Sequence, residues 1–165
     1  MTEPESPDES DRHSVGLIIA AVLSWIPLLV VLIGTLTMHD LPARVPVHWS
    51  LDGTVDRWDS TAAGFWFDLP FGIAGGVLVT AIVIFGGNNI SRLKGALGLA
   101  VIVLLSAGIS GLWPASVAIA RDGVGSQHAM GILMLCALIL AVLVYASAAL
   151  PRRAARAHVR DDKET

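Results

Sequence analysis

Charged residues and cysteine are both scarce in this chain. Only 15% of its 165 residues are Asp, Glu, Lys or Arg, against about 25% in ordinary soluble domains. Cys136 is the single cysteine, which excludes an internal disulfide and a cysteine-based metal site; we expect it to be a small buried hydrophobe. Basic stretches with interleaved aromatics are lacking outside the C-terminal segment, so nucleic acid is not an expected partner.

Charge is absent altogether from four long stretches of sequence. These are Val15–Met38, Leu69–Ser91, Gly95–Ala120 and Gly123–Leu150. Each is longer than the roughly 20 apolar residues that a helix needs to cross about 30 Å of hydrocarbon. A chain of this length has too little interior to bury four such helices, and too little sequence remains for a soluble catalytic domain. The lipid bilayer is therefore the expected surrounding of these stretches.

The sequence predicts an all-α membrane protein with one transmembrane domain, residues 15–150. The four spans are expected at about 15–38, 69–90, 95–120 and 128–150, with an outer loop at 39–64. Residues 1–14 carry five acids and one base, the opposite of a signal peptide, and are expected to form a disordered tail. Residues 151–165 form a basic tail.

The basic residues also predict an orientation. Eight of the eleven lie in the N-terminal segment, in the connection around residues 91–94 or in the C-terminal segment. Because positive charge is enriched in cytoplasmic segments, both termini are expected in the cytoplasm. Nine of the eleven are arginine, and the spans are rich in alanine, valine and glycine. This composition is typical of a GC-rich bacterial genome, which indicates a bacterial plasma membrane.

Small residues predict how the helices pack, because membrane helices associate by close backbone approach. The second span contains Gly72-x-x-x-Gly76, followed by Thr80, and the third contains Ala107-x-x-x-Gly111. The short connection between these spans predicts an antiparallel helical hairpin with the two small-residue faces together.

Ionisable groups are lacking at mid-depth, which argues against an ion-coupled transporter. Asp68 stands beside the aromatic residues Phe65–Phe67 and before a Leu-Pro pair. We expect it to be the N-cap of the second helix, at an interfacial aromatic belt, and His128 to lie near the outer end of the fourth span. Pro27 and Pro114 are expected to bend the first and third spans.

The outer loop has the pattern of a small β-hairpin. Pro42 and Pro46 impose an extended chain, and apolar residues then alternate up to Trp49, the period of a half-buried strand. Asp52-Gly53 is a turn signal, and Thr54–Trp58 is expected to return as the second strand. The two tryptophans are expected to rest on the membrane surface or on the end of the bundle.

This loop also resembles a known family. The residues concerned are Leu41-Pro42-x-x-Val45-Pro46-x-His48-Trp49, Asp52-Gly53-x-x-Asp56-x-Trp58, Ser60 and Leu69-Pro70. The pattern is similar to that of the bacterial membrane family described as "domain of unknown function 1648". That family includes the N-terminal part of immunity proteins against Sdp-type peptide toxins, so the resemblance implies an immunity-like role with a peptide ligand. Thr61 departs from the pattern, since the family often has lysine there, and residues 91–165 do not resemble the second half of the immunity proteins.

His48, Asp52, Asp56 and Asp59 have two interpretations. Folded across a turn, they offer the ligand types of a divalent cation site. In the alternative, His48 donates a hydrogen bond to a loop carboxylate, Asp52 closes the turn and Asp56–Arg57 is solvated. A rigid hairpin places His48 and Asp56 facing one another across the turn. We expect the hydrogen-bonded hairpin, with no metal and no cofactor.

Three functions remain open at this point. The first is a non-enzymatic membrane protein that senses or binds a ligand through its outer loop. The second is a structural subunit that docks another membrane protein, and the third is a metal-dependent hydrolase at the membrane surface, using His48 with Asp52 or Asp56. We favour the first. Its expected site residues are Pro42, Pro46, His48, Trp49, Asp52, Gly53, Asp56 and Trp58.

Overall fold

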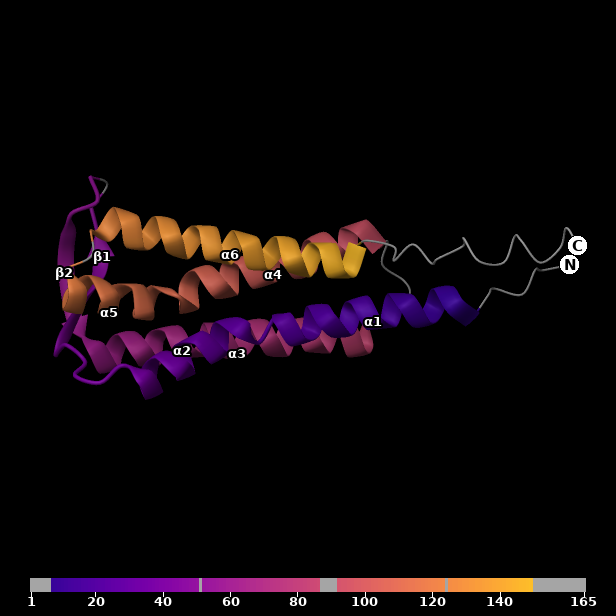
Figure 1. Cartoon of the computed structure of the whole chain (residues 1–165), viewed down its shortest axis with the longest axis horizontal. Coiled ribbons are helices and arrows are strands. Elements are labelled where there is room, and N and C mark those ends of the chain that lie inside the picture. Colours follow the sequence, from indigo (N-terminus) through magenta and orange to yellow (C-terminus); the bar gives the residue numbers. More distant parts are fainter. Residues whose placement is uncertain (1–6, 51, 87–91, 124, 150–165) are drawn as a thin grey trace, which may run out of the picture.

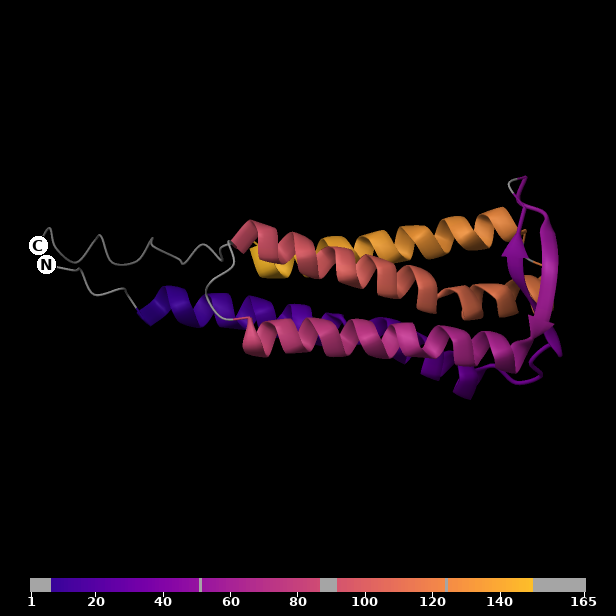
Figure 2. The ribbon, with the colours of Figure 1, turned by 180° about the vertical axis from the view of Figure 1, so that it is seen from behind.

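The computed structural model describes residues 7–50, 52–86, 92–123 and 125–149. Its elements are α1 (Pro7–Leu23), α2 (Ile26–Thr37), β1 (Arg44–Trp49), β2 (Val55–Ser60), α3 (Thr61–Phe85), α4 (Arg92–Ser110), α5 (Leu112–Asp122) and α6 (Ser126–Ala149). The helices run along the long axis of an elongated bundle, and the β1–β2 hairpin lies across one end of it (Figure 1). The view from behind shows the same arrangement (Figure 2).

Among the described residues, four helical segments are long and apolar enough to cross a membrane, as the sequence predicts. They are Val15–Thr37, Thr61–Phe85, Leu93–Asp122 and Gln127–Ala149. Large apolar side chains such as Leu36 and Phe85 are exposed on their outer faces. Cys136 is also exposed rather than buried, so the prediction of its burial was wrong. Because lipid is as apolar as a helix core, α6 needs no protein neighbour at that position.

The second span begins earlier than predicted, and Asp68 is not its N-cap. Helix α3 starts at Thr61, directly after β2, and the Ser60 side chain caps it by accepting a hydrogen bond from the Ala63 backbone N–H at 3.1 Å. The connection between the first two spans therefore ends at Ser60 instead of residue 64. Pro70 therefore lies inside α3, whereas the sequence pattern suggests a position in the first turn of the helix.

The N-terminal segment also differs from expectation. Residues 7–14 form the first turns of α1 rather than a disordered tail. Pro7 is the first helical residue, where its fixed φ suits a helix. Residues 1–6 and the predicted basic tail at 151–165 lie outside the described residues.

Both predicted bends coincide with interruptions of a helix. The chain turns at residues 24–25, between α1 and α2, and Pro27 lies in the first turn of α2. Gly111 separates α4 from α5, and Pro114 is the third residue of α5. A proline has no N–H to donate, so the first turn of a helix tolerates it.

The small-residue faces pack, but against partners other than those predicted. A Cβ on Gly76 would lie 2.7 Å from the Trp25 ring, and one on Gly72 would lie 3.1 Å from the Leu28 backbone. Both glycines therefore face the α1–α2 segment instead of α4. Gly111 lies against Leu133 of α6, and Ala107 belongs to the buried cluster that α4 shares with α1, α3 and α6.

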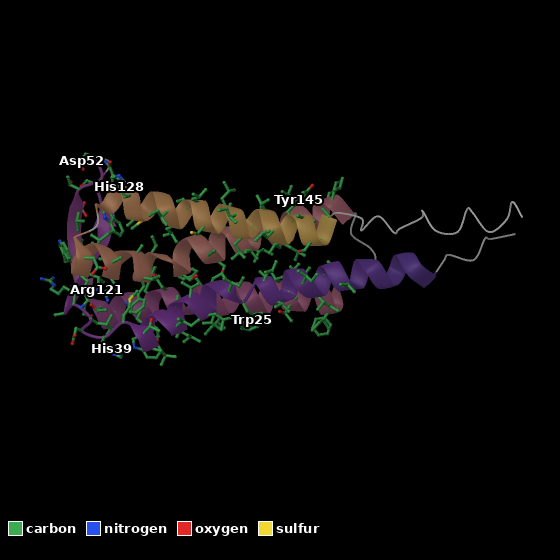
Figure 3. The ribbon with its side chains drawn as sticks, viewed as in Figure 1. Trp25, His39, Asp52, Arg121, His128 and Tyr145 are labelled. Atoms are coloured by element: carbon green, nitrogen blue, oxygen red, sulfur yellow. The ribbon has the colours of Figure 1, made fainter. Side chains whose placement is uncertain are left out.

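The partners were wrong because sequence spacing identifies a small face without its neighbour. The flat ring of Trp25 packs against α3 at Gly76, where no side chain stands in its way. The Trp25 indole N–H also donates to Thr80 Oγ1 at 3.1 Å, which fixes the ring on α3. Between α3 and α4 the close approach is made by Gly75 and Ser106, and the Ser106 hydroxyl donates to the Phe71 carbonyl at 2.9 Å. Figure 3 shows Trp25 partway along the bundle.

Candidate functional site

Polar side chains gather at the hairpin end of the bundle. Figure 3 shows His39, Asp52, Arg121 and His128 there, whereas Tyr145 lies toward the opposite end. His128 is the third residue of α6, as expected for the outer end of that span. The labelled charged and histidine side chains therefore lie at the hairpin end of the bundle.

The predicted hairpin is present, and its return strand β2 starts one residue later and ends two residues later than expected, at Ser60. Strands β1 and β2 pair antiparallel from Arg44 opposite Ser60 to Trp49 opposite Val55. Gly53 has a φ of +82°, which favours glycine. Asp52 Oδ1 accepts hydrogen bonds from the Thr54 backbone N–H at 3.0 Å and the Thr54 hydroxyl at 2.7 Å. The Asp52-Gly53 turn signal thus acts as predicted.

Asp56 joins the two strands near this turn. His48 Nδ1 lies 2.6 Å from Asp56 Oδ1, and the Ser50 hydroxyl donates to Asp56 Oδ2 at 3.0 Å. The hydrogen bond from His48 holds the pKa of Asp56 below its usual 3.8. The hydrogen bonds from Thr54 likewise lower the pKa of Asp52. His48 and Asp56 are both solvent-exposed, so their contact organises the hairpin more than it stabilises the bundle.

The metal-site interpretation needs more side chains than the structure brings together. Asp52 is bonded to Thr54, and Asp59 accepts a hydrogen bond from the Ser60 backbone N–H at 2.7 Å. Within residues 7–50, 52–86, 92–123 and 125–149, no three His, Cys, Asp or Glu side chains lie close enough to share a metal ion.

The hairpin is held on the bundle by its first strand. Val45 and Pro46 are buried, and Val45 packs in a cluster with Val31, Trp113 and Val117 (the Trp113 cluster). The Thr61 hydroxyl donates to the Pro42 carbonyl, which ties the start of the loop to α3. A regular alternation would place Pro46 on the exposed face of the strand. Pro46 is buried instead, because bulges disturb the register beside His48. Strand β2 is mostly exposed, including Trp58 at 42%.

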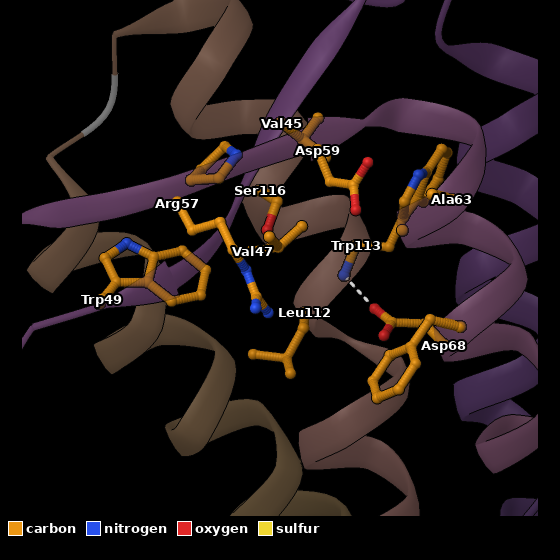
Figure 4. Close-up of a pocket in the computed structure, with 13 residues that line it drawn as sticks. Val45, Val47, Trp49, Arg57, Asp59, Ala63, Asp68, Leu112, Trp113 and Ser116 are labelled. Atoms are coloured by element: carbon orange, nitrogen blue, oxygen red, sulfur yellow. Dashed lines mark hydrogen bonds between the residues drawn. The ribbon is translucent and has the colours of Figure 1, made fainter.

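A cavity of about 350 Å³ lies between the hairpin and helices α3 and α5 (Figure 4). We call it the hairpin cavity. Its walls include Val47 and Trp49 of β1, Phe67 of α3, and Leu112 and Trp113 of α5. Arg57 and Asp59 of β2 also line it and are exposed. Asp68 is 3% exposed and lies on its α3 side. The cavity thus runs from a charged rim to a buried carboxyl group.

Asp68 caps a helix other than its own. Its Oδ2 accepts a hydrogen bond from the backbone N–H of Trp113, the second residue of α5. The interruption at Gly111 creates this helix N-terminus, and Gly111 has no side chain to satisfy the free N–H groups there. A carboxylate from a neighbouring helix does so instead, and the positive end of the helix dipole favours it. The same contact joins α3 to α5 under the hairpin.

Trp49 contributes an unusual polar atom to this region. Its indole Nε1 is buried and has no hydrogen-bond partner among the residues that the structure describes. Buried polar atoms in native proteins are usually paired. The Trp49 side of the cavity therefore contains one hydrogen-bond donor without a partner among the described residues.

The sequence identified the hairpin but not the cavity beneath it. Of the predicted site residues, Trp49 and Pro46 line the cavity, whereas His48, Asp52, Gly53 and Asp56 build the turn and Pro42 anchors the loop. The sequence pattern suggests that Asp68 caps its own helix, and it does not mark Trp113 as a site residue. The signal that points to them is Pro114, because an interrupted helix inside an apolar stretch leaves N–H groups that need an acceptor.

The pair of His48 and Asp56 is expected to act as one unit. Replacing either with alanine should increase the rate of trypsin cleavage after Arg57, and the double variant should be no worse than the worse single one, because contacting residues couple. Asp56 stabilises the hairpin fully above pH 3.8 and loses this effect as the pH falls below that value, through its lowered pKa. Additive effects of the two substitutions, or a change in cleavage on adding a chelator, would contradict the hydrogen-bonded hairpin.

Comparison with known proteins gives a match over part of the chain. Residues 17–73 match the family model described as "Domain of unknown function (DUF1648)". The matched segment contains all but the first two residues of the span Val15–Thr37, the whole hairpin and the first turns of α3, including Asp68. The search of curated proteins and the search of solved structures each gave no match.

Proposed function

We propose, on the premise that residues 17–73 belong to the family described as "Domain of unknown function (DUF1648)", that this membrane protein binds a small ligand in the hairpin cavity and senses it without catalysing a reaction. The observation that carries the proposal is the cavity itself, with its exposed charged rim and its buried carboxyl group. A volume of about 350 Å³ lies at the lower end of the range for small-molecule sites, roughly 300–1,000 Å³.

The composition of the cavity supports binding more than catalysis. Aromatic and aliphatic side chains surround a few convergent polar groups, which is typical of small-ligand sites. Among the described residues, the lining has no histidine, the side chain that most often serves as general base. Its one hydroxyl, that of Ser116, therefore has no histidine or lysine in the lining to activate it as a nucleophile. A peptide, the ligand implied by the resemblance to toxin-immunity proteins, would enter by one terminus or one side chain, because the cavity is too small for more.

The position of the cavity supports sensing. Its walls come from three separate elements, the hairpin, α3 and α5. A ligand that contacts them together favours the docked hairpin over an undocked one by its difference in affinity for the two states. Because α4 and α5 together form the span Leu93–Asp122, we propose that a change at the cavity is transmitted along this span toward the opposite end of the bundle.

The proposal is tested by blocking the cavity. The probes are 2-phenylethylammonium, 2-phenylethanol and 3-phenylpropionate, which share a ring and differ in charge, added to the purified protein in detergent. At least one is expected to change the fluorescence of Trp49 and Trp113 saturably. Ala63→Phe fills the cavity from α3 and should abolish this binding. Ala74→Phe, on an exposed face of the same helix, is the matched control. The proposal fails if no probe binds, or if Ala63→Phe binds like the control.

The hairpin end is proposed to face the outside of a bacterial plasma membrane, with both termini in the cytoplasm. The test uses a Cys136→Ser background, so that added cysteines alone report. Ser50→Cys should react with a membrane-impermeant thiol reagent on intact cells, whereas Ser91→Cys should react only after permeabilisation. Labelling of Ser91→Cys alone on intact cells would reverse the proposed orientation.

A further inference from the structure

The charges that line the hairpin cavity do not balance. Arg57 and Asp59 are two residues apart on β2 and both line the cavity at its exposed rim. Their opposite charges cancel in the net charge of the lining, although Figure 4 shows the Arg57 guanidinium extending toward Leu112 and away from Asp59. Asp68 is the remaining ionisable side chain among the lining residues, and it is buried on the α3 side. An ionised Asp68 therefore leaves the lining of the cavity as a whole with a net negative charge.

The described protein groups use only part of the hydrogen-bonding capacity of the Asp68 carboxylate. A carboxylate has about four acceptor positions, and the structure shows one hydrogen bond to Asp68 within the described residues, from the Trp113 backbone N–H. The helix N-terminus behind that N–H carries roughly half a positive charge. Burying an ionised carboxylate with so few partners has a large free-energy cost. A ligand that brings hydrogen-bond donors and positive charge into the cavity lowers this cost.

The rest of the lining is suited to an organic cation rather than a hydrated ion. Aromatic rings of Trp49, Phe67 and Trp113 share the cavity with Asp68, and such rings attract cations over their faces. Figure 4 shows the Asp68 carboxylate and the rings of Trp49 and Trp113 on different sides of the same space. An apolar group attached to the cation would replace water against Val47 and Leu112.

We infer that the ligand of the hairpin cavity is a small organic cation, an ammonium group carrying an apolar substituent, with Asp68 as its counter-ion. This inference rests on the proposed function and names the ligand class for the same cavity. The ammonium group donates to the Asp68 oxygen that Trp113 leaves free, so one carboxylate holds both the ligand and the start of α5. Ligand binding is thereby linked to the contact between α3 and α5.

The test compares probes and variants by their dissociation constants. The parent protein is expected to bind 2-phenylethylammonium about tenfold more tightly than 2-phenylethanol, because a charge-assisted hydrogen bond is lost with the alcohol. Asp68→Asn keeps an acceptor for the Trp113 N–H and removes the charge, so it should bring the two constants together. Asp40→Asn removes a charge from the exposed loop, at a φ of 60° that asparagine tolerates, and should leave the preference intact.

A second measurement keeps the inference testable if Asp68→Asn does not fold. In Ser116→Cys on the Cys136→Ser background, the new thiol lines the cavity. Relative to a free thiol in solution, a cationic methanethiosulfonate reagent should modify it faster than an anionic one of similar size. Equal binding of the neutral and cationic probes, or faster modification by the anionic reagent, would overturn the inference. Binding of the neutral probe alone would leave the proposed function standing, whereas absence of all binding would remove both.

Discussion

Trp113→Ala is expected to lower the free energy of unfolding by about 3–5 kcal/mol, the usual range for deleting a buried tryptophan, and to release the hairpin from the bundle. Trp113 is 2% exposed and lies in the Trp113 cluster with Val31 and Val45. Its indole N–H donates to the Thr61 carbonyl at 2.9 Å. The ring therefore joins α2, β1 and α3 to α5, and its loss leaves a void at their junction.

Two glycines line the space in which the Trp113 ring packs. A Cβ on Gly34 or on Gly64 would lie 3.3 Å from atoms of the Trp113 ring, and the ring of Phe65 meets it edge-on at 5.6 Å between centroids. Because the surroundings are built around one flat side chain, they cannot close over an alanine without moving whole helices. This rigidity places the expected cost at the upper end of the range.

The prediction is measured as the melting temperature in detergent together with the rate of trypsin cleavage after Arg44 and Arg57. Trp66→Ala is the matched control, since Trp66 is 67% exposed on the neighbouring face of α3. Trp113→Phe retains most of the packing and should lose only about 1 kcal/mol, from the hydrogen bond to Thr61. If Trp113→Ala melts and is cleaved like Trp66→Ala, the hairpin is held by other contacts.

Gly76→Leu is expected to separate α3 from the α1–α2 span. Its Cβ alone would lie 2.7 Å from the Trp25 ring, so the ring must leave its seat and give up its hydrogen bond to Thr80. Overpacking of this kind costs about 1–3 kcal/mol, and more where backbones must shift. The result should be a lower melting temperature in detergent.

Gly98→Leu is the matched control for this substitution. A Cβ there meets no atom of the described residues within 4 Å, so the variant reports only the gain of about 1 kcal/mol from replacing a helical glycine. The double variant Trp25→Ala/Gly76→Leu should recover part of the loss, because it removes the ring that the leucine displaces. Equal melting temperatures for Gly76→Leu and Gly98→Leu would show that the contact between α3 and Trp25 contributes nothing.

The candidate site shows which features a short sequence pattern can predict and which it cannot. The φ of Gly53, the closure of the turn by Asp52 and the contact of His48 with Asp56 could all be predicted, because each joins residues fewer than ten positions apart. The role of Asp68 could not, since its partner Trp113 is 45 positions away. As a result, a residue that resembles the cap of its own helix caps another one.

The sequence by itself determined the membrane class, the number of spans, the hairpin and the two helix interruptions. These features follow from apolar length, from proline and glycine chemistry, and from turn signals, which act within one segment of chain. Tertiary structure decided which helix each glycine faces and where α3 begins. It also decided that the hairpin covers a cavity. Those outcomes depend on which surfaces fit together: Trp25 on Gly76, Trp113 between Gly34 and Gly64, and Asp68 at the free N–H groups that the interruption at Gly111 exposes.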